Sequence, residues 1–422
     1  MKKHLTLLGV AAVATAVLAG CSNDELVESY QGEEISFRTR VETRATETTL
    51  GNLAEFKVWG DAKGYSTFFL TGGTATKDPE HDTSYNLTTK EGNKVYWPSG
   101  VDKIDFWAYA PSDISITPNI NTTTQQLNGY TPEANVTNGG KNHKDLIVAH
   151  AEAYKAQQAS IPLVFKHALS NISLKLQSGD GTKMMRVKGA WFVNAKNTGD
   201  ITFVNDDNPI NWSITNAKDE CYGVTFGAGE IPMVNNVAKS AIIDRENKST
   251  DLMLIPQEIK GLVFSADGTV ATKGSYILLL CQILQVHPGA IHVEEGTSTV
   301  ADDEKHYHQL FPEKSTVIES GNDFTNEFGY TCVPVDFSWK AGKKYIYTLE
   351  FCGKTSGGGL YPPTTLPDDL PGTGEDIVIV ERPNTKKPGD PVLDKPISFT
   401  VDVEKWSEAK EEGAGEIEKP MQ

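Results

Sequence analysis

The sequence predicts an all-β protein built from two antiparallel β-sandwich domains in series. Three observations support this fold class: hydrophobic and polar residues alternate in short runs, clusters of Gly, Asn, Asp and Pro separate the runs, and helical periodicity is confined to residues 150–158 and 406–412. Period-two runs are typical of strands that bury one face, and many short strands with few helices predict sandwiches. The chain has 422 residues, more than one sandwich uses, so we expect two.

The clearest alternating runs mark strands in both expected domains, at residues 35–41, 104–109, 172–177 and 397–404. A Gly-containing linker at residues 177–182 separates the two domains in our prediction. We therefore expect an N-terminal sandwich over residues 33–178 and a C-terminal sandwich over residues 179–422. Within the second, residues 287–329 are polar with little alternation and residues 353–395 are rich in Gly and Pro, so both are expected to be long loops.

The first 21 residues predict secretion. A basic head of four residues precedes an uncharged segment rich in Leu, Val and Ala, which is typical of a signal peptide. The segment ends in LAGC at residues 18–21, which resembles the lipobox of bacterial lipoproteins. That resemblance implies removal of residues 1–20, lipidation of Cys21, and a lipidated tether over residues 21–32 that anchors the chain to the outer membrane. An ordinary signal peptide followed by a cysteine is the alternative.

The charge balance and the missing motifs exclude several classes of protein. With 39 Lys+Arg against 56 Asp+Glu the formal net charge is −17, which argues against a nucleic-acid partner because phosphate binding needs a basic surface. No nucleophile elbow or nucleotide-binding loop is present, and no pair of acids stands out for glycoside hydrolysis. We expect a protein that is not an enzyme and has no cofactor.

The histidines are candidate metal ligands, and the cysteines are candidate disulfide crosslinks. His287, His292, His306 and His308 lie close in sequence, but the segment is predicted to be a loop without a zinc motif, so we expect solvated histidines and no metal. Five cysteines are too few for a disulfide scaffold. Cys281 and Cys352 fall in two expected strands that could be neighbours, so a disulfide between them and separate buried thiols both stay open.

A series of short segments resembles one family, the Mfa-like fimbrillins of Bacteroidetes, which are the subunits of type V pili. Besides the lipobox they are ISF at 35–37 leading to TRAT at 43–46, FKVW at 56–59, DLIVA at 145–149, FKHALSNI at 165–172, LMLIPQ at 252–257, WKAGKKYIY at 339–347 and VDVEKW at 401–406. The resemblance implies two transthyretin-like β-sandwiches. Asp24 and Glu25 also resemble the surface-export signal of lipoproteins from these bacteria.

The resemblance further implies a mode of assembly. An arginine-specific protease removes the N-terminal segment with its first strand, and a C-terminal strand of the next subunit fills the groove. Here residues 33–40 would be the removable strand and Arg44–Ala45 the scissile bond, because the Thr-rich surroundings favour protease access. Arg38 and Arg40 are rival sites inside the strand, and a surface arginine without a role is the alternative for Arg44.

The C-terminal region supplies the candidate donor strand. Ile397, Phe399, Val401 and Val403 alternate with polar residues, so they are candidate plugs or, alternatively, the closing strand of the second sandwich. The charged tail after residue 406 suits an accessory, tip or anchor subunit. A different hypothesis is a glycan-binding surface lipoprotein that uses the long loops of the second domain, and a hydrolase with a loop-borne site ranks below it.

Overall fold

The computed structural model describes most of the chain, and its strands carry the fold. The described residues are 33–41, 53–134, 136–157, 160–204, 210–214, 217–225, 231–233, 238–241, 250–288, 305–313, 326–368, 370 and 377–405. Within them the helical segments are the short 3₁₀ turns η1 (Lys155–Gln157) and η2 (Val392–Asp394), so the all-β prediction is confirmed. No helix among these residues has the length and hydrophobicity needed to cross a membrane.

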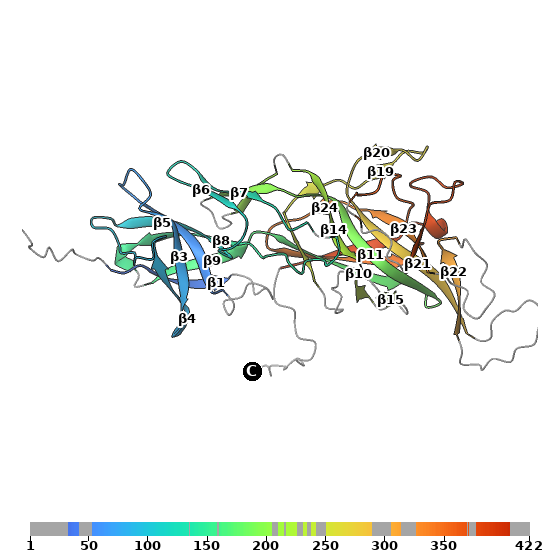
Figure 1. The fold of residues 1–422 in the computed structure, drawn as a ribbon, viewed down its shortest axis with the longest axis horizontal. Helices are drawn as coiled ribbons and strands as arrows, with labels where there is room; N and C mark the ends of the chain where they lie inside the picture. Colours follow the sequence, from blue (N-terminus) through green and yellow to red (C-terminus); the bar gives the residue numbers. More distant parts are fainter. Residues whose placement is uncertain are drawn as a thin grey trace, which may run out of the picture.

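The N-terminal half forms a closed barrel, which lies at the blue end of the elongated molecule (Figure 1). The described strands follow each other around it in the order β1 (Ser36–Val41), β4 (His81–Thr88), β3 (Leu70–Asp78), β2 (Glu55–Ala62), β5 (Lys103–Ala110), β8 (Ile147–Tyr154) and β9 (Ile161–His167). We expected an antiparallel sandwich. The sheet closes because β1 pairs antiparallel with β4 on one side and parallel with β9 on the other.

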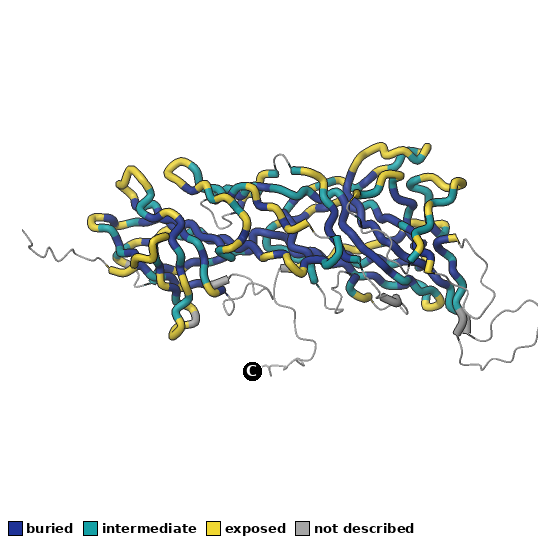
Figure 2. The backbone as a smooth tube through the Cα atoms, in the orientation of Figure 1, coloured by how far each residue is buried: buried dark blue, intermediate teal, exposed yellow. Residues whose placement is uncertain are grey.

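The C-terminal half is a sandwich of two sheets. One has the order β16 (Lys239–Ser240), β10 (Ser170–Ser178), β25 (Lys343–Phe351) and β27 (Ser398–Lys405), with β17 (Leu252–Leu254) paired to β10. The other has the order β14 (Asp219–Thr225), β11 (Lys183–Lys196), β21 (Tyr276–Pro288), β23 (Glu327–Pro334) and β26 (Val378–Val380), with β15 (Ile231–Met233) on β11 and β22 (Lys305–Phe311) on β21. Side chains from both sheets form one hydrophobic core, and the buried strands run inside a rim of exposed loops (Figure 2).

Two expectations about this half need correction. The strand β10 was expected to end the first domain, yet it pairs along its length with β25, so the change from barrel to sandwich falls between His167 and Ser170. The polar segment 287–329 was expected to be a loop, but its ends belong to strands: β22 pairs with the end of β21, and β23 begins at Glu327.

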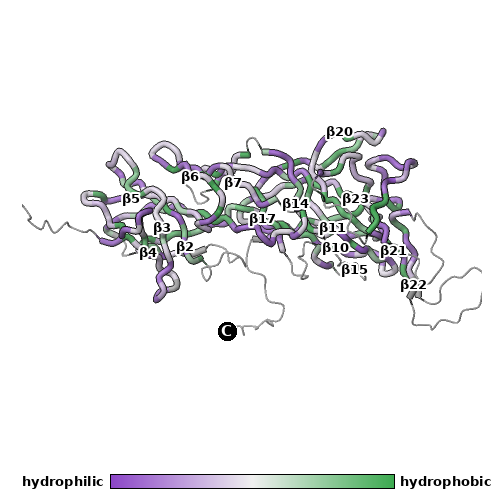
Figure 3. The backbone as a smooth tube through the Cα atoms, viewed as in Figure 1, coloured by the Kyte–Doolittle hydropathy of each residue, from purple (hydrophilic) through white to green (hydrophobic). Residues whose placement is uncertain are grey.

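The segment 353–395, expected to be a long loop, is packed against the β21 sheet. Strand β26 lies at the edge of that sheet, and Leu360 exchanges backbone hydrogen bonds with Cys332 of β23. Leu360, Leu366 and Leu370 pack on a second hydrophobic cluster on the outer face of the sheet, around Trp191. The sheet is therefore covered on both faces, in agreement with the hydrophobic strands and hydrophilic peripheral loops of Figure 3.

The two halves share a junction that includes an antiparallel sheet with strands from both. The first half contributes β6 (Thr117–Ile120) and β7 (Gln125–Tyr130), and the second half contributes β12 (Gly199–Phe203) and β13 (Ile210–Ser213). Two separate strand pairs lie elsewhere in the second half: β18 (Glu258–Ile259) with β24 (Phe337–Ser338), and β19 (Val263–Phe264) with β20 (Val270–Thr272). One hydrophobic cluster collects side chains from both halves at the junction. The halves are therefore packed directly against each other there.

Several of the family-like segments meet at this junction. His167 of β9 donates from Nδ1 to Oδ1 of Asp145 at 3.0 Å, and both side chains are fully buried. The backbone N–H of Gly342 donates to the carbonyl of Leu169, and the hydroxyl of Ser170 donates to the carbonyl of Lys340. Buried hydrogen-bonded groups are costly to leave without partners, so these contacts order the chain on each side of the junction.

Candidate functional site

The first candidate element is β1, which closes the barrel between β4 and β9; we call this position the seam. Phe37 is fully buried and its ring lies 5.7 Å from that of Phe56 and 5.2 Å from that of Phe106, both edge to face. Ile35 and Thr39, the inward neighbours on either side, are also buried. Arg38 points outward and is exposed. The predicted alternation of this strand is therefore present, and its inner face is part of the barrel core.

Thr39 is the polar exception on the inner face of β1. Its side chain is only 5% exposed, and within the described part of the chain no group lies at hydrogen-bonding distance from its Oγ1. A buried hydroxyl without a partner costs roughly 1–3 kcal/mol. The inner face of β1 therefore includes one buried polar group, at Thr39, that disfavours its place in the barrel.

Two backbone hydrogen bonds and one ion pair hold the start of β1. The N–H of Ile35 donates to the carbonyl of Val95 at 2.9 Å, and the N–H of Trp97 donates to the carbonyl of Glu33 at 2.9 Å. Beside these bonds Nζ of Lys94 donates to Oε2 of Glu34 at 2.8 Å. The side-chain pair is exposed and contributes little to stability, so the backbone bonds and the inner face hold the strand.

Three predicted site residues lie outside the described residues. They are Cys21, expected to carry the lipid, and Arg44 and Ala45, expected to flank the processed bond. The residues around this bond fall in a gap of the description between residue 41, the last of β1, and residue 53, shortly before β2. The cleavage and lipidation assignments therefore stay predictions.

The second candidate element is β27, an edge strand. It forms an antiparallel ladder with β25 from Ser398 opposite Glu350 to Lys405 opposite Lys343, and in the sheet order it has no described neighbour on its other side. The side chains of Phe399, Val401 and Val403 are 40%, 36% and 56% exposed. An exposed edge with apolar side chains is a template for pairing with another chain.

Ile397 differs from the other candidate plugs. It is 4% exposed and belongs to the sandwich core, directly before β27 begins. The alternation along the strand is therefore real in sequence, but Ile397 already has a place in its own domain. The other three, Phe399, Val401 and Val403, lie opposite the buried Leu349, Tyr347 and Tyr345 but are themselves partly exposed. β27 is thus the last strand of its own sandwich sheet here, and the roles of donor and of closing strand both stay open.

The described cysteines are buried, and none of them forms a disulfide with another described cysteine. Cys281 and Cys352, the pair left open as a disulfide, lie in the same core cluster without a bond between them. Burial raises the pKa of the Cys281 thiol and raises that of Cys352 to about 11. Both are therefore protonated and unreactive at neutral pH.

The histidine segment gives no metal site among the described residues. The backbone register of the β21–β22 hairpin places His287 opposite His306 and Gln285 opposite His308. His292 lies outside the described residues, as do the side chains of His287 and His306. No group of three or more His, Cys, Asp or Glu side chains in the part that the structure describes is arranged to hold a metal ion.

A cavity of about 700 Å³ lies on the outer face of the β21 sheet. Its lining comes from the edge strand β14 and its neighbour β11, from the segment that contains β19 and β20, and from residues 363–368 of the long Gly- and Pro-rich segment. The β11 contribution includes Asn194, which sits in the left-handed region at φ 67° where the strand bulges. Its Nδ2 donates to the carbonyl of Gly274 at 2.7 Å, which joins the bulge to the opposite wall.

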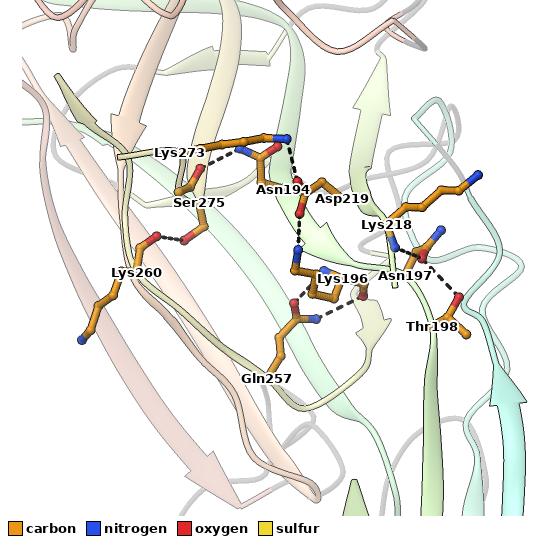
Figure 4. Close-up of polar contacts among 11 residues, drawn as sticks. Asn194, Lys196, Asn197, Thr198, Lys218, Asp219, Gln257, Lys260, Lys273 and Ser275 are labelled. Atoms are coloured by element: carbon orange, nitrogen blue, oxygen red, sulfur yellow. Dashed lines mark hydrogen bonds and ion pairs between the residues drawn. The ribbon is translucent and has the colours of Figure 1, made fainter. Parts of the chain in front are cut away.

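Asp219 is held in this cavity by two ion pairs (Figure 4). Lys196 and Lys273 approach it from two sides, with N–O distances of 2.6 and 2.7 Å. Partial burial alone would raise the pKa of the Asp219 carboxyl, but the two lysines outweigh it and lower that pKa below the usual value. The cavity therefore combines an apolar floor, which includes Leu262 and Tyr276, with a fixed carboxylate and an exposed ammonium group at its rim.

This cavity and the buried hydroxyl of Thr39 were not predicted from the sequence. Asn194, Asp219 and Lys273 carry no motif, and the segments that contain them meet only through the folding of the sandwich. For Thr39 a signal was present in the sequence, because it is the polar residue in an otherwise apolar alternation from Ile35 to Val41.

Comparisons with known proteins identify a family and a curated relative. A family model described as "Fimbrillin-like" matches residues 43–359. Fimbrium subunit Fim1C of Phocaeicola vulgatus is 27% identical over 183 residues, which cover 38% of this chain and 48% of that protein, so the match spans about half the length of this curated relative.

Similar solved structures include two at low identity. The tip fimbrial protein Mfa3 from Porphyromonas gingivalis is 9% identical with a TM-score of 0.32, over 88% of this chain and 100% of that one. A candidate cell adhesion protein from Parabacteroides distasonis is 9% identical with a TM-score of 0.41, over 90% and 99%. The family match does not depend on either, since it covers well over half of the sequence: the chain belongs to the fimbrillin-like family.

Proposed function

We propose that this protein is a structural or accessory subunit, at the tip or the anchor, of a type V pilus, and that it serves adhesion at the cell surface. It would be delivered to the outer membrane as a lipoprotein through Cys21 and processed by an arginine-specific protease at Arg44–Ala45. Its partners would be other pilus subunits, joined by strand addition, and a receptor on a host cell or a glycan. The observation that carries the proposal is that the barrel seam is filled by β1, a short segment next to the expected cleavage site.

The backbone pairing and the burial of β1 support strand exchange between subunits. Removing β1 would expose unpaired N–H and C=O groups on β4 and β9 and an apolar slot between them. A strand added from another subunit would restore the backbone ladder and fill the slot with alternate side chains. The edge strand β27, whose apolar side chains are exposed, has the composition that such a donor needs.

The test of this proposal is the response to limited trypsin. Wild-type chain is expected to give a stable fragment that begins at Ala45, followed by SDS-resistant ladders, because cleavage frees β1 from covalent attachment. The Arg44→Ala variant is expected to keep β1 and to remain monomeric. N-terminal sequencing and SDS gels without heating measure both effects, and an Arg44→Ala chain that is processed and assembles like wild type would refute the assigned site.

A second candidate function, binding of an oligosaccharide, is favoured by the cavity on the β21 sheet. Sugar sites combine apolar contact with a few convergent polar groups, and the floor and rim described above provide both. The walls include residues of the long segment 353–395 that was expected to hold a ligand.

Two lysines provide a matched pair of variants for this second candidate. Lys273 lines the cavity and pairs with Asp219, while Lys260 lies outside the lining and pairs with Asp336; their side chains are 71% and 75% exposed. We expect Lys273→Ala to remove glycan-array signals that Lys260→Ala retains. An array on which the wild type gives no signal, or on which both variants keep it, would exclude this cavity as the sugar site.

A further inference from the structure

A second cavity, of about 370 Å³, lies beside the cavity that holds Asp219. Its walls come from β22, β23 and β26, from the residues that follow β26, and from the Pro-containing segment 361–366. Pro363, Thr364 and Leu366 line both cavities, and the side chain of Thr364 is exposed. A single short stretch of chain that reaches the surface therefore separates the two cavities, and a ligand in one can continue over Thr364 into the other.

Two tyrosine side chains shape the second cavity. Tyr330 on β23 is partly buried, and its ring lies 6.4 Å from that of the buried Trp191. The ring of Tyr361 lies 6.1 Å from that of Phe311, and its backbone N–H donates to the carbonyl of Asp390 at 2.9 Å. Burial raises the pKa of both tyrosines, so their hydroxyls stay protonated at neutral pH and can donate hydrogen bonds. Rings in fixed positions with polar tips suit a sugar, which has apolar C–H faces and polar edges.

Carboxylates outnumber cationic groups in the described lining of the two cavities. Five acidic residues, among them Asp219 and Glu313, stand against two cationic residues, Lys273 and Arg382. Carboxylates accept hydrogen bonds from hydroxyl groups, and they repel a ligand that carries a carboxylate of its own. The lining therefore favours a ligand that is rich in hydroxyl groups and not acidic.

We propose that the two cavities are subsites of one site, and that this site binds a linear oligosaccharide that has no acidic group and is long enough to reach from one cavity to the other. The inference rests on the second candidate function above, to which it adds the second cavity, the length of the ligand and its charge class. The volumes of about 700 and 370 Å³ both lie within the range of roughly 300–1,000 Å³ that is usual for small-molecule sites. Each cavity can therefore hold part of the chain of sugars, which crosses the protein surface at Thr364.

Asn384 and Thr385 provide a matched pair of variants. They are neighbours in one exposed turn after β26, but only Asn384 lines the second cavity. Asn384→Trp would place an indole ring in that cavity, whereas Thr385→Trp adds the same side chain outside it. Because both positions are exposed, neither substitution is expected to disturb the core of the sandwich.

The experiment measures binding of the full chain to an array on which each linear glycan is present from the disaccharide to the hexasaccharide, with and without a terminal uronic acid. Wild-type chain is expected to bind long uncharged glycans about tenfold more tightly than short ones, because contacts in the second cavity add to those in the first. Asn384→Trp is expected to remove this gain and to bind the short glycans like wild type. Thr385→Trp is expected to keep the gain.

The terminal uronic acid tests the charge class of the ligand. It is expected to weaken binding several-fold at low salt and less at high salt, because salt screens the repulsion from the lining carboxylates. Acidic glycans that bind as tightly as uncharged ones would show that this class is wrong.

The length series separates this inference from the function on which it rests. If long glycans bind no better than short ones, or if Asn384→Trp keeps the gain, the second cavity is not part of the site, while sugar binding in the first cavity stands. If the wild type binds no glycan of any length, the second candidate function is wrong and the joined site with it.

Discussion

Replacing Phe37 by Ala is expected to lower the free energy of unfolding of the barrel by about 3–5 kcal/mol, the usual range for a fully buried phenylalanine. The ring is inaccessible to solvent and packs edge to face against Phe56 and Phe106. Its removal leaves a cavity in the middle of the seam, where the closed sheet has little freedom to collapse. The same change should accelerate release of β1 after cleavage, because the inner face holds this strand more firmly than its exposed ion pair.

Urea unfolding of the uncleaved chain measures the free energy of unfolding. Size-exclusion chromatography at successive times after cleavage measures the rate at which the β1 fragment is released. Arg38→Ala is the matched control, since it truncates the next residue of the strand on the exposed face and should change stability by no more than about 0.5 kcal/mol. Equal losses of stability in the two variants would mean that Phe37 does not anchor β1.

The local pattern of each strand was predictable from sequence, while the pairing of strands was not. Ile35 and Phe37 were assigned to one face because alternation is a property of neighbouring residues. The parallel contact of β1 with β9 joins Phe37 to Ile161, and nothing in either segment specifies that partner. The barrel was for this reason missed: among its described strands only β1 and β5 fall in the expected alternating runs, and β8 overlaps residues 150–158, whose periodicity was interpreted as helical.

The misplaced domain boundary has a similar cause. The Gly-containing segment after Ser178 was interpreted as a linker, but it is the turn from β10 in one sheet to β11 in the other sheet of the same sandwich. The true junction has no turn signal, because only Ala168 and Leu169 separate β9 from β10 and both are buried. A boundary that is covered by a shared core looks like a continuous hydrophobic segment in sequence.

Two acidic substitutions on β27, Phe399→Asp with Val401→Asp, are expected to abolish SDS-resistant ladders after trypsin while leaving the monomer folded. In the monomer both side chains are exposed on an edge strand, so the backbone ladder with β25 persists and the free energy of unfolding changes little. In a seam between β4 and β9 the same side chains would be buried, and a carboxylate without a partner there is strongly disfavoured.

The control is Thr400→Asp, which adds a charge to the same strand at a position that would face outward in the seam. It should assemble like wild type, because the outer face of β1 already accepts the charged Arg38 in solvent. If the double variant still forms ladders, β27 is not the strand that fills the seam. If all three positions prevent ladders equally, the net charge of the strand controls assembly and the two faces of β27 are equivalent, which the buried inner face of β1 argues against.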